Sequence, residues 1–461
     1  MERYINSFAT ENDIQTALQN GELLKPYVAY IEDVDRIDWN SKEKVDYATE
    51  YLTFNILSAG TINWTASDSS VTKTIEYKLN NNEWASITSN TGSSAPTITV
   101  NSGDKLQFRG NNAQYTNSYS VYNSFSGSTA SFEVEGNVMS LIYGDDFKNK
   151  LAISSGYALA SLFRGCTKLV SAKNLILPAT TLAENCYDDM FNNCKSLTTA
   201  PELPATTLAS GCYNSMFVNC TSLTIAPALP AMTLAYSCYS VMFYGCTSLT
   251  TAPKLPATTL ANNCYYGMFQ GCTSLTTAPE LPATTLANSC YYSMFKGCTS
   301  LTTAPELPAT TLANGCYYQM FYDCTSLTVV PALPATVLAE ECYRGMFWNC
   351  TGLTTVPSNL LPATTLKSDC YRDMFYVCKN LTTAPELPAT TLTVLCYDSM
   401  FYGCTKLNYI KCLATDISAL YCTSGWLSGV ASTGTFVKAS SMTSWTEGNS
   451  GIPTGWTVQD A

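Results

Sequence analysis

One pattern of apolar and polar positions repeats along most of the chain. From Cys186 to Cys404 the cysteines fall in pairs eight residues apart, and successive pairs start 26 residues apart, except for two extra residues before Cys370. One unit reads SLTTAPELPATTLANNCYYGMFQGCT. A period of roughly 20–50 residues predicts a solenoid or another array of stacked repeats.

Each unit contains two expected elements. The segment LTTAPELP is rich in Thr and bounded by Pro, which predicts a short strand followed by a turn. In TTLANNCYYGMFQG, the Leu, Ala, Cys, Tyr, Met and Phe that recur almost unchanged from unit to unit share one side if each residue advances by about 100°. The variable residues fall on the other side. This pattern predicts a short helix with a fixed inner face and a variable outer face.

The ends of the predicted helices are also visible. The residue before the second Cys is Gly, Asn or Asp in nine of the ten units from Gly165 to Gly403, with Val377 as the exception. These types tolerate the left-handed backbone that often ends a helix. Strands pair about 4.8 Å apart, whereas helices pack about 8–10 Å apart. We therefore expect about eleven coils, from Ala158 to Val430, curved with the sheet on the concave side.

The predicted fold class is a curved α/β solenoid of leucine-rich-repeat type, preceded by a small α+β module and an all-β sandwich. Residues 1–48 are expected to form the N-terminal module and residues 49–145 the sandwich, whose runs such as YLTFNIL and KLQFRG alternate apolar and polar residues. The solenoid is expected over residues 146–431. A short β cap is expected over residues 432–461.

The amino-acid composition excludes several classes of function. The 461 residues include no His, which removes His-based catalysis and His-ligated zinc. The net charge of −11 argues against a nucleic-acid partner, and no apolar run is long enough to insert into a membrane. No secretory signal peptide is visible at the start. We expect no enzyme activity, no cofactor and no metal site.

Two sets of chemically reactive residues, the recurring glutamates and the cysteines, are interpreted as structural and not as catalytic. Glutamates recur at one repeat position, but Ala or Lys replaces them in other units, which indicates a solvated column of side chains. The glutamates are Glu202, Glu280, Glu306 and Glu386, and the replacements are Ala228, Lys254 and Ala332. The cysteines of one unit would lie about 12 Å apart on a helix, too far for a disulfide. Two ladders of buried, reduced thiols are favoured, with a disulfide ladder between coils as the alternative.

The array resembles the BspA-like leucine-rich repeats, which carry an L-T-S-V-T-I-P strand and an A-F-x-G-C helix end. Here LTTAPELP and MFQGC occupy those places, over about 270 residues. The resemblance implies binding and attachment, not catalysis.

The segments KPYVAYIED and RIDWN resemble the N-terminal piece of virion proteins from Bacteroidales phages and prophages, including crAss-like phages. This resemblance implies a virion fibre protein, assembled in the host cytoplasm. Its residues 1–48 would contact other virion proteins, and its solenoid would bind a host-surface protein or glycan. The alternative is an exported BspA-like adhesin on the bacterial cell surface. Association of identical chains remains open.

The predicted binding residues lie on the variable outer face. They are the Tyr, Trp and Arg residues two and six positions after the first Cys, namely Tyr266, Tyr292, Tyr318, Tyr322, Arg344, Trp348, Arg372, Tyr376 and Tyr402. These residue types dominate binding hot spots, and aromatic faces also suit sugar rings. The Thr-rich sheet is the rival surface, because concave sheets bind partners in many solenoids.

Overall fold

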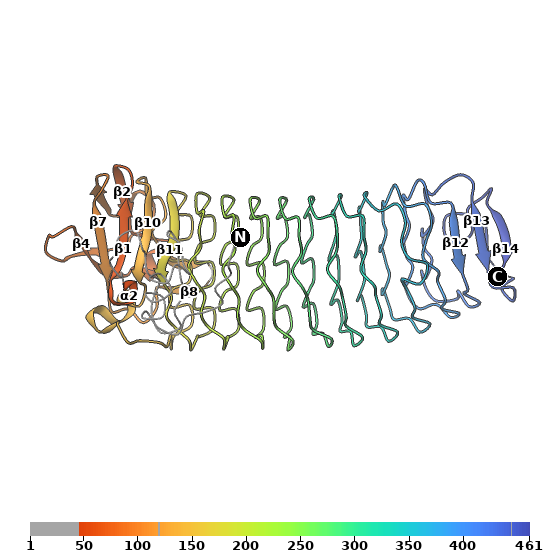
Figure 1. The fold of residues 1–461 in the computed structure, drawn as a ribbon, viewed down its shortest axis with the longest axis horizontal. Helices are drawn as coiled ribbons and strands as arrows, with labels where there is room; N and C mark the ends of the chain where they lie inside the picture. The colour runs from red at the N-terminus through yellow and green to blue at the C-terminus, as the bar shows by residue number, and fades with distance from the viewer. Residues whose placement is uncertain (1–45, 119, 444) are drawn as a thin grey trace, which may run out of the picture.

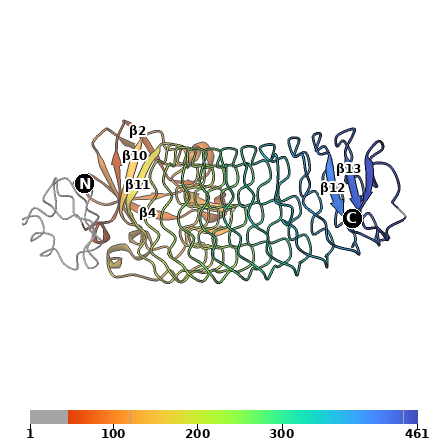
Figure 2. The same ribbon diagram turned by 45° about the vertical axis from the view of Figure 1, so that its right-hand side comes forward.

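The computed structural model describes residues 46–461 except residues 119 and 444. Coils stack along a nearly straight axis, between a β-rich block at one end and a small parallel sheet at the other (Figures 1 and 2). Of the module predicted for residues 1–48, all but the last three residues lie outside the described residues. Within the described part, we find no helix with the length and apolar character needed to cross a membrane.

A six-stranded sheet organises the β-rich block. In spatial order its strands are β11 (Leu169–Ile176), β10 (Phe132–Asn137), β1 (Leu52–Ile56), β7 (Lys105–Arg109), β4 (Thr74–Leu79) and β5 (Ala85–Thr88). Neighbouring strands are antiparallel except β10 and β11, which are parallel. The sheet therefore crosses the boundary expected after residue 145, because β11 already belongs to the repeat array.

Two smaller sheets accompany it. They comprise β2 (Gly60–Asn63) with β6 (Thr97–Val100), and β3 (Thr65–Ala66) with β9 (Val121–Ser124) and β8 (Thr116–Ser118). The helical turns of the described residues are α2 (Ser140–Tyr143) and the 3₁₀ turns η1 (Tyr47–Thr49), η2 (Ser69–Val71), η3 (Gly92–Ser94) and η4 (Gly144–Asp146). Phe54, Phe108 and Phe125 form a buried aromatic cluster that Trp64 joins.

The helices predicted for the repeats are absent, and hydrogen-bonded turns stand in their place. Backbone N–H groups in these segments alternate between two kinds of acceptor. In one coil, the N–H of Asp188 donates to the carbonyl of Asn185, three residues back, at 3.2 Å. The next N–H, of Asp189, donates to the carbonyl of Asn214 in the following coil at 3.0 Å. Half of these groups thus connect successive coils, which an α-helix does not allow because it satisfies them internally.

The backbone of each turn segment is left-handed at every fourth residue. Asn185, Asp189 and Asn193 have φ of 52°, 57° and 61°, and the equivalent residues of the other coils behave alike. The left-handed residue expected before the second Cys is therefore confirmed. It is the last of three such positions, not a helix cap. The recurring residues follow the same strict period of four, whereas a helix has 3.6 residues per turn.

The predicted curvature is wrong, because both sides of each coil have nearly the same spacing. On the Thr-rich side, isolated parallel bridges join neighbouring coils, such as Thr199 with Ile225. On the turn side, the rings of Phe191 and Phe217 stack 5.4 Å apart. Without helices that require about 8–10 Å, neither side is forced to expand. The stacked coils support a solenoid, but without its predicted helices and curvature.

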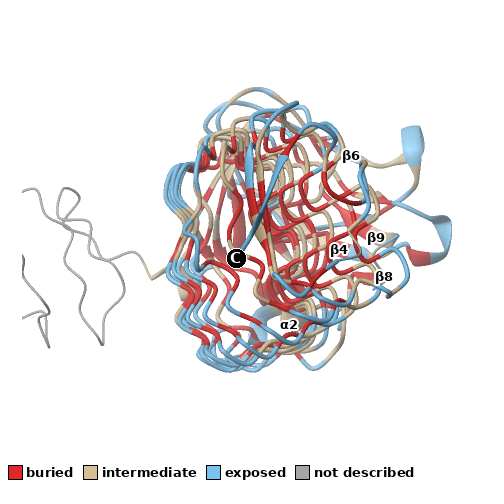
Figure 3. Cartoon of the chain, turned by 90° about the vertical axis from the view of Figure 1, so that its right-hand side faces the viewer, coloured by how far each residue is buried: buried red, intermediate tan, exposed pale blue. Residues whose placement is uncertain are grey.

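The core consists of ladders of identical side chains. The Tyr after the first Cys stacks on its equivalents from Tyr187 to Tyr397, with centroids 5.7–6.2 Å apart. A Phe ladder runs beside it and reaches Phe125 of the β-rich block through Phe163, at 5.9 Å. Viewed along the axis, buried residues fill the inside of the coils and exposed residues form the rim (Figure 3). This continuous core joins the block to the stack.

The C-terminal end closes with a parallel sheet of β12 (Tyr409–Cys412), β13 (Thr435–Lys438) and β14 (Thr457–Asp460). Trp426 continues the Tyr ladder at 6.1 Å from Tyr397 and stacks on Trp445 at 5.6 Å. These larger rings cover the end of the core.

The left-handed positions make a matched pair of substitutions informative. Val377 has φ 59°, a conformation that is strained for a β-branched residue, while Gly403 occupies the same position of the next coil with φ 70°. We expect Val377→Asn to raise the free energy of unfolding by about 1 kcal/mol, because left-handed backbone costs roughly 1–2 kcal/mol. Gly403→Val should lower it, since its Cβ alone would lie 3.3 Å from the Val377 side chain. Thermal unfolding of both variants checks this, and two shifts of the same sign would contradict it.

Candidate binding surface

The predicted binding residues lie together on the outer side of the turn segments. They form two columns, two and six residues after the first Cys of each coil. Eight of the nine are half-buried, while Tyr402 is 40% exposed. The structure thus brings them onto one face, although on turns and not on helices.

The first column contains the Tyr266 ladder, which we define as Tyr266, Tyr292, Tyr318 and Arg344. The first two rings stack with centroids 4.7 Å apart, and the next pair stacks at 4.4 Å. The guanidinium of Arg344 lies 5.3 Å from the centre of the Tyr318 ring, where a cation is attracted to the ring face. Arg344 therefore closes one end of the ladder.

The second column contains the Trp348 ladder, which we define as Lys296, Tyr322, Trp348, Tyr376 and Tyr402. Successive ring centroids lie 5.3, 4.1 and 4.7 Å apart. The ammonium of Lys296 lies 4.2 Å from the centre of the Tyr322 ring. Sequence reasoning missed this lysine, although its place six residues after Cys290 puts it in the same column.

Stacking changes what the rings can bind. An inner ring such as Tyr292 or Tyr376 has a neighbouring ring on each face. The expectation that this row of aromatic faces suits sugar rings is therefore wrong for the inner rings, because only their edges remain accessible.

Charged residues continue the first column beyond the rings. Arg344 and Arg372 share four carboxylates, those of Glu341, Asp369, Asp373 and Asp398. The shortest contacts join Arg344 to Glu341 at 2.7 Å and Arg372 to Asp398 at 2.9 Å. Burial raises the pKa of Asp373 to about 6, although both arginines oppose the shift. Sequence reasoning missed these acids, although Asp398 lies in the first column itself, two residues after Cys396, and Asp373 directly follows Arg372.

A second polar cluster lies where the stack meets the β-rich block. Arg164 forms an ion pair with Asp189 and lies 5.1 Å from the ring centre of Tyr122 in β9. Asn214 donates to Asp188 at 2.8 Å. Burial, and next the charge of Asp189, raise the pKa of Asp188 to about 7. This carboxyl is therefore partly protonated near neutral pH.

The rival Thr-rich surface is flat, not concave, because the stack is straight. Its exposed positions are mainly Thr, with apolar replacements such as Ile225 and Val329, which are 72% and 53% exposed. A shallow apolar groove of about 660 Å³ lies beside Pro201 and Pro227, with Lys173 and Glu202 on its lining. Among the described residues, this face carries no aromatic ladder.

The glutamate column lies on this Thr-rich side. Glu202, Glu280 and Glu306 are exposed, and Glu386 forms an ion pair with Lys411 at 3.2 Å. In the described part of the chain, no cluster of three or more His, Cys, Asp or Glu residues has the arrangement of a metal site.

All 21 cysteines are free and buried, as predicted. The second thiol of each unit, from Cys194 to Cys404, lies 3.0–3.1 Å from the carbonyl oxygen of a Phe in the preceding coil and donates to it. Burial raises the pKa of these thiols, which keeps them protonated and unreactive. Their role is to fill the core.

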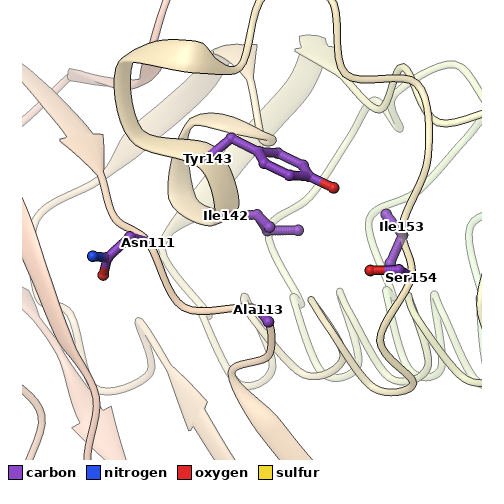
Figure 4. Close-up of a pocket in the computed structure, with 6 residues that line it drawn as sticks. All are labelled: Asn111, Ala113, Ile142, Tyr143, Ile153 and Ser154. Atoms are coloured by element: carbon purple, nitrogen blue, oxygen red, sulfur yellow. The ribbon is translucent and has the colours of Figure 1, made fainter.

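A small pocket lies between the β-rich block and the first coils (Figure 4). Its volume is about 120 Å³, and Asn111, Ile142, Tyr143 and Ser154 are among its lining residues. Pockets for small-molecule ligands usually measure about 300–1,000 Å³. This one has room for a few water molecules.

Comparison with known proteins identifies the repeats. A family model described as "BspA type Leucine rich repeat region" matches residues 159–276, 237–382 and 319–420, in six copies. Together these stretches cover more than half of the chain. No curated protein and no solved structure matches this chain.

The shifted pKa of Asp188 predicts a pH dependence of stability. A carboxyl whose pKa is higher in the folded than in the unfolded state favours folding when protonated, so its contribution is lost as pH rises from about 4 to about 7. Asp188→Asn should therefore stabilise the protein at pH 8, by roughly 1–4 kcal/mol, and change little at pH 4. Thermal unfolding at both pH values tests this. Glu306→Gln, which alters an exposed carboxylate, is the control, and an equal effect of Asp188→Asn at both pH values would refute the assignment.

Proposed function

Because the chain belongs to the family of proteins with BspA type leucine rich repeats, we propose that it is a non-enzymatic binding protein whose outer turn face contacts a receptor. Repeats of this family are typically binding or scaffold modules. One observation supports the choice of the outer turn face. The inner positions of the coils keep the same residues, while the outer columns change from coil to coil and gather Tyr, Trp and Arg. A framework alone does not require this variation.

We further propose that the protein is a phage or prophage virion fibre. In this proposal residues 1–48 attach it to the particle, and the stack presents the outer face to a host-surface receptor. The resemblance of KPYVAYIED and RIDWN to virion proteins supports this role. The straight stack, with its continuous core, suits a rigid extension.

Deleting residues 1–45 tests attachment to the particle. The cut lies before β1 and leaves the six-stranded sheet complete, whereas a cut at residue 146 would remove five of its strands. We expect the shortened chain to keep the melting temperature of the full chain and to be absent from particles in immunogold electron microscopy. Normal incorporation would contradict the attachment role. Labelling of the bacterial surface in the absence of particles would favour the exported adhesin.

The buried thiols allow each face to be blocked separately. Glu340 is exposed on the outer turn side, and Val329 is 53% exposed on the Thr-rich side of the same repeat. Glu340→Cys and Val329→Cys each add one accessible thiol to a chain whose native thiols are buried, so a maleimide-linked polyethylene glycol should react there alone.

We expect polymer at Glu340→Cys to reduce attachment to host cells at least about tenfold, because it covers the proposed contact face. Polymer at Val329→Cys should change attachment less than about twofold. Cell-binding assays with the unlabelled variants control for the substitutions. The reverse result would assign the binding site to the Thr-rich side.

A further inference from the structure

Three hydroxyl groups of the Tyr ladder are buried without a protein partner. Tyr187, Tyr213 and Tyr239 are at most 1% exposed, and their hydroxyls form no hydrogen bond with any described residue. Burial, and next the charges of Tyr187 and Cys212, raise the pKa of Tyr213, so its hydroxyl stays protonated and needs an acceptor. Buried polar groups nearly always have a partner, which is either a protein atom or an ordered water molecule.

The chain retains these hydroxyl groups although Phe would fill the same space. In the neighbouring ladder from Phe191 to Phe401, rings without a hydroxyl group stack with centroids 5.4–5.7 Å apart. A hydroxyl group that is buried without a hydrogen bond destabilises the folded state. Tyr nevertheless follows the first Cys in each of the nine coils from Tyr187 to Tyr397. This recurrence indicates that the hydroxyl groups have partners in the folded protein.

The spacing of the ladder leaves room for one water molecule between successive hydroxyl groups. The rings of Tyr187 and Tyr213 are parallel within 6° with centroids 5.7 Å apart, and those of Tyr213 and Tyr239 are parallel within 5° at 5.9 Å. Equivalent atoms of parallel rings in stacked coils are displaced like the centroids, so neighbouring hydroxyl oxygens are too far apart for a direct bond of about 2.5–3.0 Å. An oxygen atom midway between them would lie about 2.9 Å from each, within that range.

We propose that this part of the core is an internal binding site for water, with one molecule between Tyr187 and Tyr213 and a second between Tyr213 and Tyr239. Each water molecule accepts a hydrogen bond from one hydroxyl group and donates one to the next. Buried water molecules in proteins typically make two to four such bonds. The site lies inside the coils, so the inference does not depend on the proposed function.

The surroundings suit a small neutral ligand and not a cation. Burial raises the pKa of Cys186 to about 12 and also raises that of Tyr213, so the thiol and hydroxyl groups beside the site are uncharged. A cation would be buried there without a compensating negative charge, which is unfavourable. A larger organic molecule would not fit between hydroxyl groups that are one ladder step apart.

Oxygen-17 magnetic relaxation dispersion, which counts the water molecules held inside a protein, tests the inference on the full chain in solution. Tyr213→Phe removes the hydroxyl group that both water molecules share, so we expect it to lower the count by two relative to the wild type. Tyr343→Phe makes the same change in the same ladder, away from the three enclosed hydroxyl groups. It is the matched control and should leave the count unchanged.

The melting temperature gives a second readout. If the site were dry, Tyr213→Phe would remove a buried unpaired hydroxyl group and raise the melting temperature. With water bound, the variant leaves each water molecule with one partner fewer, so we expect a lower melting temperature. Equal water counts in the wild type and Tyr213→Phe would overturn the inference, as would a higher melting temperature of Tyr213→Phe. An equal loss of water in Tyr343→Phe would also overturn it, because the water molecules would then lie elsewhere.

Discussion

The structure of the repeat array depends on backbone hydrogen bonds between successive coils. In the turn segments, alternate N–H groups donate to the next coil, as Tyr187 does to the carbonyl of Cys212 at 3.0 Å. Each coil must then lie directly on its neighbour, at a spacing set by these bonds. Left-handed backbone at every fourth residue turns the groups toward the neighbouring coil, and its cost is offset by the bonds it permits.

This spacing explains both faces of the turn segment. Inside, it places equivalent rings in contact, so Tyr and Phe form ladders and the small thiols fill the space beside them. Outside, any aromatic residue that recurs in consecutive coils must stack on its equivalent, as Tyr376 does on Tyr402. The ring faces between neighbouring coils are consequently covered, and the ring edges remain accessible.

The sequence predicted the repeats, the buried reduced cysteines and the outward direction of the variable residues, because each follows from strict recurrence at fixed positions. It did not predict the turns. Over the short segment from Leu260 to Cys272, periods of 3.6 and 4 both place the recurring residues on one side. The sequence did indicate a period of four through Asn263, Gly267 and Gly271, which lie four residues apart and all have a left-handed backbone. The prediction of curvature was wrong because it depended on the predicted helices. The ladders were not predicted because contact between equivalent side chains depends on the spacing between coils.

Scalar coupling across hydrogen bonds tests this account most directly. A long-range HNCO experiment on the labelled protein should detect coupling between the amide nitrogen of Tyr187 and the carbonyl carbon of Cys212 in the next coil. The same coupling should recur between the equivalent pairs along the stack, from Tyr213 with Cys238 to Tyr397 with Cys422. Coupling of Tyr187 to the carbonyl of Ala183, four residues back, would indicate an α-helix and contradict the account.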